Sequence, residues 1–453
     1  MSNSQFSILQ ADVILSSPSA EDRVIDVSAH IVELTLFENI NKPYIDARIV
    51  MMDDFGFRNN LQIQGTERLR LVVGGGESPE IPIFVKYFFF SKILDSVKGS
   101  DRAEVLSIEL VEEHVYVNAV KSISRSYESN LEDMMSNIVT GELGKSVISD
   151  DFAGTAQGVR KVIVPYLSPL EAVQWLKDRA TTRTGSPIYL SGDLYSDNLF
   201  LRDLETLLKR DVVNEDLPYR LSEANAMIDT DKEFLRPYFE ILSYREMESE
   251  NSLKLYEEGA IGSYYSNLDA GTGQVSGGHV SVRDIITELY TNEMIGTSAT
   301  QSLFDPSLEI DGRLSDEYNS LFIHQVTSTN TYNQFQGYHD EAVVLDNNGD
   351  PSESKLKVKN KIIRQLLKKN VIEISMSGVS MFRGKISPGS KLRLLFLNPD
   401  VSSADRDQFK QIDTRKSGDY FLLATSHKLL DESHNVSMRL TKLNDLPKDV
   451  ILK

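Results

Sequence analysis

The stretch VIEISMSGVSMFRGKISPGSKLRLLF, residues Val371–Phe396, decides the class of fold that the sequence encodes. Its apolar residues Ile372, Ile374 and Met376 alternate with polar ones, and this period of two is typical of a half-buried β-strand. The turn sequence SPGS at 387–390 follows, and a second alternating run then completes the stretch. We predict two antiparallel strands here, and no catalytic motif lies beside them in the sequence.

The composition is that of a soluble globular protein. The 453 residues exceed one ordinary hydrophobic core and indicate about three domains. A hydrophobic content of 40% with 25% charged residues excludes a disordered chain. We expect no membrane span, because no apolar run approaches the roughly 18 residues that one needs, and no secretory signal at the N-terminus. The absence of cysteine excludes disulfides and thiolate chemistry and suits assembly in a reducing compartment.

The chain is acidic. Its 48 basic and 67 acidic residues give a net charge of −19. This charge opposes tight binding to a phosphate backbone, because such binding needs clustered lysine and arginine. Solubility alone is a sufficient reason for the acidity.

The first part of the chain, residues 1–125, has the pattern of a β-barrel or sandwich. Alternating runs are separated there by short segments that contain glycine or proline, which is typical of all-β domains. The expected strands are Val24–Ile40, Ile45–Asp54, Glu67–Val73, Ile83–Leu94 and Val105–Val120.

The pattern changes to a small α/β domain over 126–235. Apolar residues recur at helical spacing over 131–138, and a second helix begins in SPLEAVQWLKDRA. In that segment Ser168 is the expected N-cap and Glu171 closes a capping box. We expect Trp175, the only tryptophan, to be a core anchor. Short strands are expected at Ile188–Leu190 and Leu199–Leu201.

The rest of the chain is expected to build a second, interrupted β-barrel. Its first part is 236–269, an insertion that is partly helical covers 270–369, and the remainder with a C-terminal tail covers 370–453. The expected strands are Phe239–Met247, Ser252–Tyr265, Val371–Met376, Leu392–Leu397, Tyr420–Ala424 and Val436–Leu443, and the expected helices are Val282–Glu293 and Lys357–Lys369.

An internal repeat relates the two β-rich parts. Gly65–Val73 resembles Gly389–Phe396, and Tyr87–Val111 resembles Tyr420–Leu443. A looser match joins ENINKPYIDARIVMMDD (38–54) to ENSLKLYEEGAIGSYYSNLD (250–269). One such pair could reflect only the general pattern of β-hairpins. Three pairs in the same chain order favour a duplication.

Histidine and glycine motifs give no sign of a reactive site. The seven histidines include no pair at the helical spacing of a metal site and no HExxH. His427 and His434 flank a hairpin turn, where we expect them to be solvated. The glycine-rich segment Gly271–His279 lacks the Gly-Lys-Ser/Thr of a phosphate loop, so we expect a flexible loop there.

Acidic residues give no firm site either. Asp346, Asn348 and Asp350 imitate the start of a calcium loop, but Pro351 and Lys357 replace the glycine and glutamate that it needs, so we reject it. No G-x-S-x-G occurs. We therefore expect no catalytic, cofactor-binding or metal-binding residues and no enzyme, although paired glycosidase carboxylates would leave little local signature.

The chain resembles the baseplate central hub proteins of contractile-tailed, T-even type bacteriophages, which are related to the hub part of type VI secretion spike proteins. The residues that carry the resemblance are Phe88–Leu110, Ser168–Leu190, and Phe382–Phe396 with the hairpin at Tyr420–Leu443. The resemblance touches both ends and the middle of the chain, but the family pattern cannot be placed on 270–369. It implies a β-rich α+β fold with two related tube-type β-barrels, an α/β domain between them and an insertion in the second barrel.

The resemblance also implies a function. It suggests a homotrimeric ring with pseudo-sixfold symmetry that joins the hexameric tail tube to the trimeric membrane-piercing spike, contacts other baseplate proteins and lets DNA pass without specific binding. It places the protein in the virion, in the tail baseplate, after assembly in the host cytoplasm. Because the chain ends about ten residues after its last expected strand, we expect the needle to be a separate polypeptide. Acidity along the bore would keep DNA from adhering.

Two other classes of function stay open. One is a tail-associated peptidoglycan hydrolase fused to a hub-like scaffold, which a zymogram would detect. The other is a β-rich carbohydrate-binding module, which would need exposed aromatic platforms. The single tryptophan within an apparent helix stripe weighs against the second class.

Overall fold

A computed structural model describes most of the chain. It covers residues 6–15, 23–54, 56, 67–75, 78–98, 104–156, 159–221, 236–247, 262–269, 273–292, 294–295, 309–310, 313–314, 321–327, 352–368, 370–396, 412–413, 416–430 and 433–446. The rejected calcium-loop residues at 346–350 lie outside this range, as does the segment 250–261 of the looser repeat.

A single hydrogen-bonded sheet of 13 strands runs through the molecule. We call its seven strands from the N-terminal part of the chain the first sheet. In order, these are β2 (Arg23–Asp26), β1 (Phe6–Leu15), β5 (Arg68–Gly75), β6 (Ser78–Lys98), β7 (Glu104–Glu112), β4 (Asp46–Asp53) and β3 (Ile31–Asn39), with a short 3-10 helix η1 (Ser28–His30) before β3. Neighbouring strands are antiparallel. Alternate residues such as Leu69, Leu71 and Ile108 are fully buried and build one core.

The other six strands close into the second barrel. They are β13 (Tyr219–Leu221), β14 (Glu240–Glu246), β20 (Val371–Ser377), β21 (Lys391–Leu395), β22 (Gly418–Leu430) and β23 (Ser433–Asn444), and a short helix α6 (Arg236–Phe239) precedes β14. β22 closes the ring because it pairs with both β21 and β23. Ile374, Met376 and Leu394 point into the core of this barrel and are fully buried. The alternation that the opening stretch predicts is therefore confirmed.

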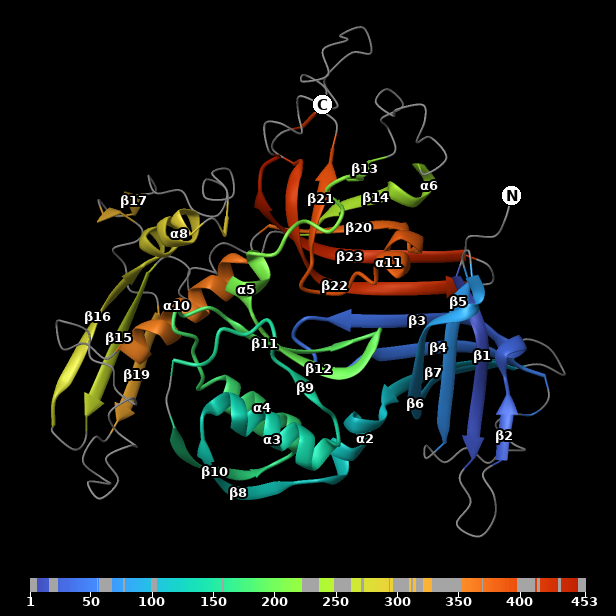
Figure 1. The fold of residues 1–453 in the computed structure, drawn as a ribbon, viewed down its shortest axis with the longest axis horizontal. Coiled ribbons are helices and arrows are strands. Elements are labelled where there is room, and N and C mark those ends of the chain that lie inside the picture. The colour runs from blue at the N-terminus through green and yellow to red at the C-terminus, as the bar shows by residue number, and fades with distance from the viewer. Residues whose placement is uncertain are drawn as a thin grey trace, which may run out of the picture.

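The first sheet and the second barrel share one seam. β3 and β22 pair antiparallel from Glu33↔Leu430 to Asn39↔Ala424. The first sheet consequently continues into the second barrel without a break (Figure 1). Within the described residues, no ladder joins β2 to β3, the two edge strands of the first sheet.

The two stronger repeat pairs occupy equivalent places. β5, β6 and β7 form an antiparallel meander, and β21, β22 and β23 form another in the same order. The looser third pair is wrong in its described part, because β15 (Gly262–Asp269) pairs outside the barrel. The strand equivalent to β4 in the second repeat is β20, because β4 pairs with β7 and β20 pairs with β23.

The expected α/β elements are present between the two β-rich units. They are β8 (Ile123–Ser129), α3 (Leu131–Leu143), β9 (Val147–Ile148), β10 (Arg160–Leu167), α4 (Pro169–Lys177), β11 (Ile188–Asp193), β12 (Ser196–Asp203) and α5 (Leu204–Leu208). α3 and α4 pack between the β8–β10 pair and the sheet of β9, β11 and β12 around a separate core (Figure 1).

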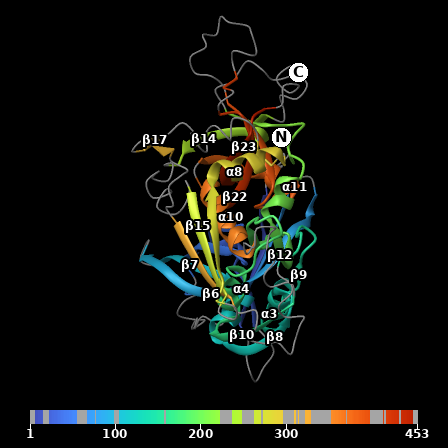
Figure 2. The ribbon, with the colours of Figure 1, turned by 90° about the vertical axis from the view of Figure 1, so that its left-hand side faces the viewer.

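The insertion has its own small sheet and two longer helices. Its elements are β15, β16 (Val275–Ser281), α8 (Val282–Thr291), β17 (Glu309–Ile310), β18 (Arg313–Leu314), β19 (Leu321–Thr327) and α10 (Ser352–Leu366). The glycine-rich segment expected to be a flexible loop is, from Val275 onward, strand β16. α10 ties the insertion to the α/β elements, because Asn360 and Arg364 donate to the backbone oxygens of Ser186 and Ile188. Figure 2 shows the insertion from its outer side.

Four other predictions need correction. The run Val24–Ile40 is not one strand, because η1 separates β2 from β3. The run Val105–Val120 is not one strand, because β7 ends at Glu112 and helix α2 (Glu113–Val120) follows. β13, expected among the α/β elements, is a barrel strand. β15, expected in the barrel, belongs to the insertion. A helix, α11 (Val379–Gly384), also interrupts the opening stretch between its two strands.

The start of α4 is the expected capping box. The Glu171 carboxylate accepts hydrogen bonds from the backbone N–H of Ser168 at 3.0 Å and from its hydroxyl at 2.8 Å. These bonds lower the pKa of Glu171.

We predict that Ser168→Ala lowers the free energy of unfolding by about 1 kcal/mol, because the box then loses one of its two reciprocal bonds. Denaturant unfolding would measure the change. Gln174→Ala, further along the exposed face of the same helix, is the control and should change stability by less. Equal losses in the two variants would contradict the capping role.

Candidate functional site at the junction of the barrels

Helix α11 joins the two β-rich cores. It follows Gly378, whose N–H donates to the backbone oxygen of His434 at 2.9 Å. Val379 and Phe382 are buried in the core of the first sheet, whereas Met381 is buried in the core of the second barrel. Because one turn of helix presents side chains to both cores, α11 fixes the two units against each other.

The Phe382 ring is the centre of this junction. It makes edge contacts with Phe6 and Phe84 of the first sheet, at 5.4 and 5.8 Å between ring centroids. It also lies 4.8 Å from the ring of His427 and 4.0 Å from that of His434. The distances to Phe6, Phe84 and His427 are typical of favourable aromatic pairs, and the His434 ring lies closer still. Phe382 therefore contacts both units at once.

The tip of the β11–β12 hairpin enters the same junction. Leu194 is fully buried in the core of the first sheet, and its backbone N–H donates to Glu38 Oε1 at 3.1 Å. The Tyr195 hydroxyl donates to the backbone oxygen of Met381 at 3.3 Å. The first sheet, the second barrel and the α/β elements thus all meet at α11.

Glu38 is a carboxylic acid buried in the seam. Its Oε2 accepts from the Thr425 hydroxyl at 3.0 Å and lies 3.6 Å from His427 Nε2. Burial, together with repulsion from Asp193, raises the pKa of Glu38 to about 8. Glu38 is therefore predominantly protonated and uncharged at neutral pH.

The prediction that His427 and His434 are solvated is wrong. The exposed fractions of these residues are 0% and 3%, and His427 Nδ1 lies 3.1 Å from His434 Nε2, within hydrogen-bond distance. β22 extends to Leu430 and β23 begins at Ser433, so the turn lies beyond both histidines. A signal was available in the alternation, since His427 is in phase with the buried Thr425 and Leu429, and His434 with Val436 and Met438.

A second buried contact ties the first sheet to the hairpin. Lys86 Nζ lies 3.3 Å from Glu112 Oε1 and donates to the backbone oxygen of Ser196 at 2.7 Å. Glu112 Oε2 accepts from the N–H of Ile45 at 2.7 Å. Because the charges are paired and hydrogen-bonded, burial of Lys86 and Glu112 is tolerated at this contact.

The expected core anchor Trp175 is only half-buried. It packs against the core of the α/β elements beside the fully buried Leu176. The guanidinium of Arg179 lies 3.8 Å from the centroid of the indole ring and covers part of it.

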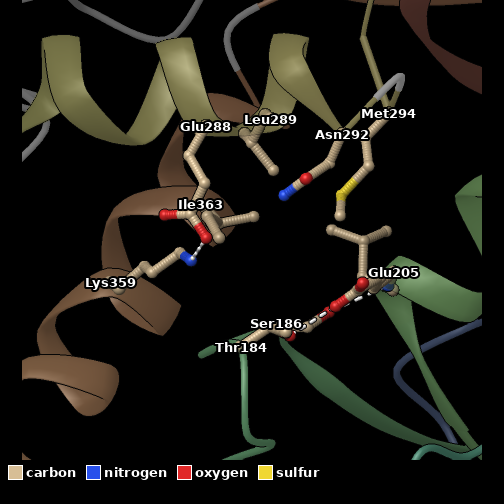
Figure 3. Close-up of a pocket in the computed structure, with 10 residues that line it drawn as sticks. Thr184, Ser186, Glu205, Glu288, Leu289, Asn292, Met294, Lys359 and Ile363 are labelled. Atoms are coloured by element: carbon tan, nitrogen blue, oxygen red, sulfur yellow. Dashed lines mark hydrogen bonds and ion pairs between the residues drawn. The ribbon is translucent and has the colours of Figure 1, made fainter. Parts of the chain in front are cut away.

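No site for small-molecule chemistry is evident in the described part of the chain. Within it, no group of three or more potential ligands could hold a metal ion, and no helix is long and apolar enough to span a membrane. A pocket between α8, α10 and α5 has a volume of about 10 Å³, room for about one water molecule (Figure 3). Its charged groups face each other: Lys359 Nζ lies 2.5 Å from Glu288 Oε1, and Thr184 donates to Glu205.

Comparison with known proteins identifies the fold. No protein-family model and no curated protein matches the sequence. The tail protein from Neisseria meningitidis MC58 matches with a TM-score of 0.52 and 10% identity, over 97% of each chain. The 43 kDa tail protein of prophage MuSo2 from Shewanella oneidensis matches with a TM-score of 0.51 and 10% identity, over 95% of this chain and 98% of that one. A component of the E. coli type VI secretion system matches with a TM-score of 0.42 and 7% identity, over 97% of this chain and 76% of that one.

The first two matches, which span nearly whole chains, show the fold. The chain has the β-rich fold of these tail proteins. The resemblance to phage tail proteins that the sequence indicates is therefore confirmed at the level of the fold.

We predict that Phe382→Ala lowers the free energy of unfolding by about 3–5 kcal/mol, because it leaves a cavity between two cores. It should also separate the unfolding of the first sheet from that of the second barrel. Hydrogen exchange resolved by segment would measure both effects. Phe396→Ala, buried in the second barrel alone, is the matched control and should leave the first sheet unchanged. Identical exchange patterns in the two variants would contradict a linking role.

We predict that Glu38→Gln becomes more stable relative to the wild type as the pH rises. A raised pKa means that the native state holds a proton that the unfolded state releases above about pH 4.5, so the wild type loses stability as the pH rises from about 4.5 to about 8. Glutamine cannot ionise. Unfolding curves at about pH 6 and about pH 9 would test this, and a stability difference that does not change with pH would refute it.

Proposed function

We propose that this protein is the structural hub of a phage tail baseplate. The observation that carries the proposal is the repeated antiparallel meander of β5–β6–β7 and β21–β22–β23, held in fixed relation by the β3–β22 seam. Three copies of a chain with two such units form a homotrimeric ring with pseudo-sixfold symmetry. That ring offers six similar docking surfaces to a hexameric tail tube, whereas one unit per chain would leave three unmatched.

The other face of the ring matches threefold partners. We place the trimeric spike protein there, with other baseplate proteins around the rim and DNA passing through without specific binding. The net charge of −19 per chain supports passage rather than retention of DNA. The protein would assemble in the host cytoplasm and reside in the tail baseplate of the virion.

The role is structural rather than enzymatic. Two tail proteins share the fold over nearly their whole length, and the buried polar cluster of the seam lies away from solvent. A zymogram with purified protein separates this role from a peptidoglycan hydrolase. Clearing that disappears when one carboxylate is changed would overturn the structural assignment.

Light scattering tests the assembly. We predict a mass about three times the 51.0 kDa of one chain and a loss of the trimer in Leu394→Asp. Leu394 is fully buried in the second barrel, so an unpaired charge there costs several kcal/mol. Leu242→Asp is the matched control, since Leu242 of the same barrel is 60% exposed, and it should keep the trimer. A wild-type protein that stays monomeric at high concentration would refute the proposal.

A further inference from the structure

The seam between β3 and β22 contains more polar chemistry than strand pairing requires. Glu38, Thr425, His427 and His434 are all buried there, and the two imidazoles face each other at 3.1 Å. Two ring nitrogens, His427 Nε2 and His434 Nδ1, are buried without a hydrogen-bond partner. Such a group normally costs stability. The cluster is therefore a poor choice for holding strands together and a sensitive place for an added charge.

We propose that the His427–His434 pair makes the seam a proton-sensitive joint, which holds the two β-rich units together while both rings are neutral and loosens when the pair takes up a proton. This goes beyond the proposed hub function and does not depend on it, because every group involved belongs to one chain.

The charged and titratable groups around the pair offer little compensation for such a proton. β3 contributes Glu38, 3.6 Å from His427 Nε2. Asp193 and Tyr195 of the β11–β12 hairpin interact with Glu38: Asp193 helps to raise the pKa of Glu38, and burial together with Glu38 raises the pKa of Tyr195. β6 contributes Lys86, which is already paired with Glu112 of β7. α11 and β1 place the uncharged rings of Phe382 and Phe6 against His434.

The proton inventory of the cluster explains why one more proton is disruptive. Burial raises the pKa of Glu38 to about 8, so near neutral pH the cluster already holds one proton, on the carboxyl. Moving that proton from Glu38 to His427, 3.6 Å away, would create an ion pair with no net charge. A second proton leaves a net positive charge among buried side chains, and that state is costly.

The direction of the pH response follows from the histidines. Burial lowers the pKa of His427 from 6.5 to about 3, and burial together with His427 lowers the pKa of His434. The unfolded or opened state binds protons below about pH 6.5 that the closed state refuses. The histidines therefore make the closed seam lose stability as the pH falls from about 6.5 toward 3, against the opposite contribution of Glu38 between about pH 8 and about 4.5.

The geometry directs the disturbance to α11. A Cβ added at Gly378 would lie 2.2 Å from His434 Nε2, so the imidazole already fills the space above the start of this helix. His434 cannot swing toward α11 unless the helix moves with it. Displacement of α11 would withdraw Phe382 from its contacts with Phe6 and Phe84, and these contacts link the two units.

Hydrogen exchange at about pH 7.5 and about pH 5 tests the proposal. Labelling times are corrected for the pH dependence of the intrinsic exchange rate, so that protection can be compared between the two pH values. The test uses Glu38→Gln as background, because this change removes the opposing titration of Glu38 and retains both histidines. At the lower pH, we expect amides of β3 and β22 in that variant to become less protected by at least about tenfold, while α3 keeps its protection. The double variant His427→Gln/His434→Gln should lose this response. His30→Gln is the control, because His30 is partly exposed beside Asp54, and it should keep the response.

Two further measurements test the proposal even if the double variant does not fold. The wild type should loosen less than Glu38→Gln between the same pH values, because the closed seam binds the Glu38 proton more tightly than the open state does. Histidine NMR should show the assigned rings of His427 and His434 staying neutral below pH 6 and then titrating together with the exchange change; burial also lowers the pKa of His114, so that ring is assigned separately. The proposal is overturned if seam amides of Glu38→Gln respond no more than those of α3, if the double variant keeps the response, or if the rings of His427 and His434 titrate near their ordinary value.

Discussion

The packing of one phenylalanine ring between two cores is the constraint on which the architecture depends. Phe382 reaches the first sheet through Phe6 and Phe84 and the second barrel through His427 and His434. Strand pairing between β3 and β22 fixes the register of the two units, but a ladder alone permits twisting and bending. The Phe382 ring and helix α11 remove that freedom, so side-chain packing fixes the angle between the first sheet and the second barrel.

Local patterns were sufficient for most elements. Alternation located the strands around Ile374 and Leu394, and capping chemistry at Ser168 located α4. The failures share a physical cause. Helix α11 is too short to show a helical period, and its residues are buried by contacts with β1 and the β11–β12 hairpin, far away in sequence. No local signal reports such contacts.

The candidate site was missed for a related reason. A histidine near a turn is ordinarily solvated, and only its phase with buried neighbours such as Leu429 indicates otherwise. Glu38 gives less warning still, because an acidic residue on a strand usually faces water. Its burial results from the hairpin tip at Leu194 and from Thr425 across the seam. The repeat, by contrast, was visible because both meanders conserve the order of strands and turns within short spans.

Trp175 has a practical consequence for any spectroscopic study of this molecule. It is the sole indole of the chain and lies among the α/β elements, half-covered by Arg179. Its emission reports the environment of α4 and does not report changes at the seam between the first sheet and the second barrel. A fluorescence melt would therefore follow one region and be mistaken for the whole. Because the sequence has no cysteine, a single cysteine introduced at an exposed position such as Lys428 could be labelled with a dye whose emission reports changes at the seam.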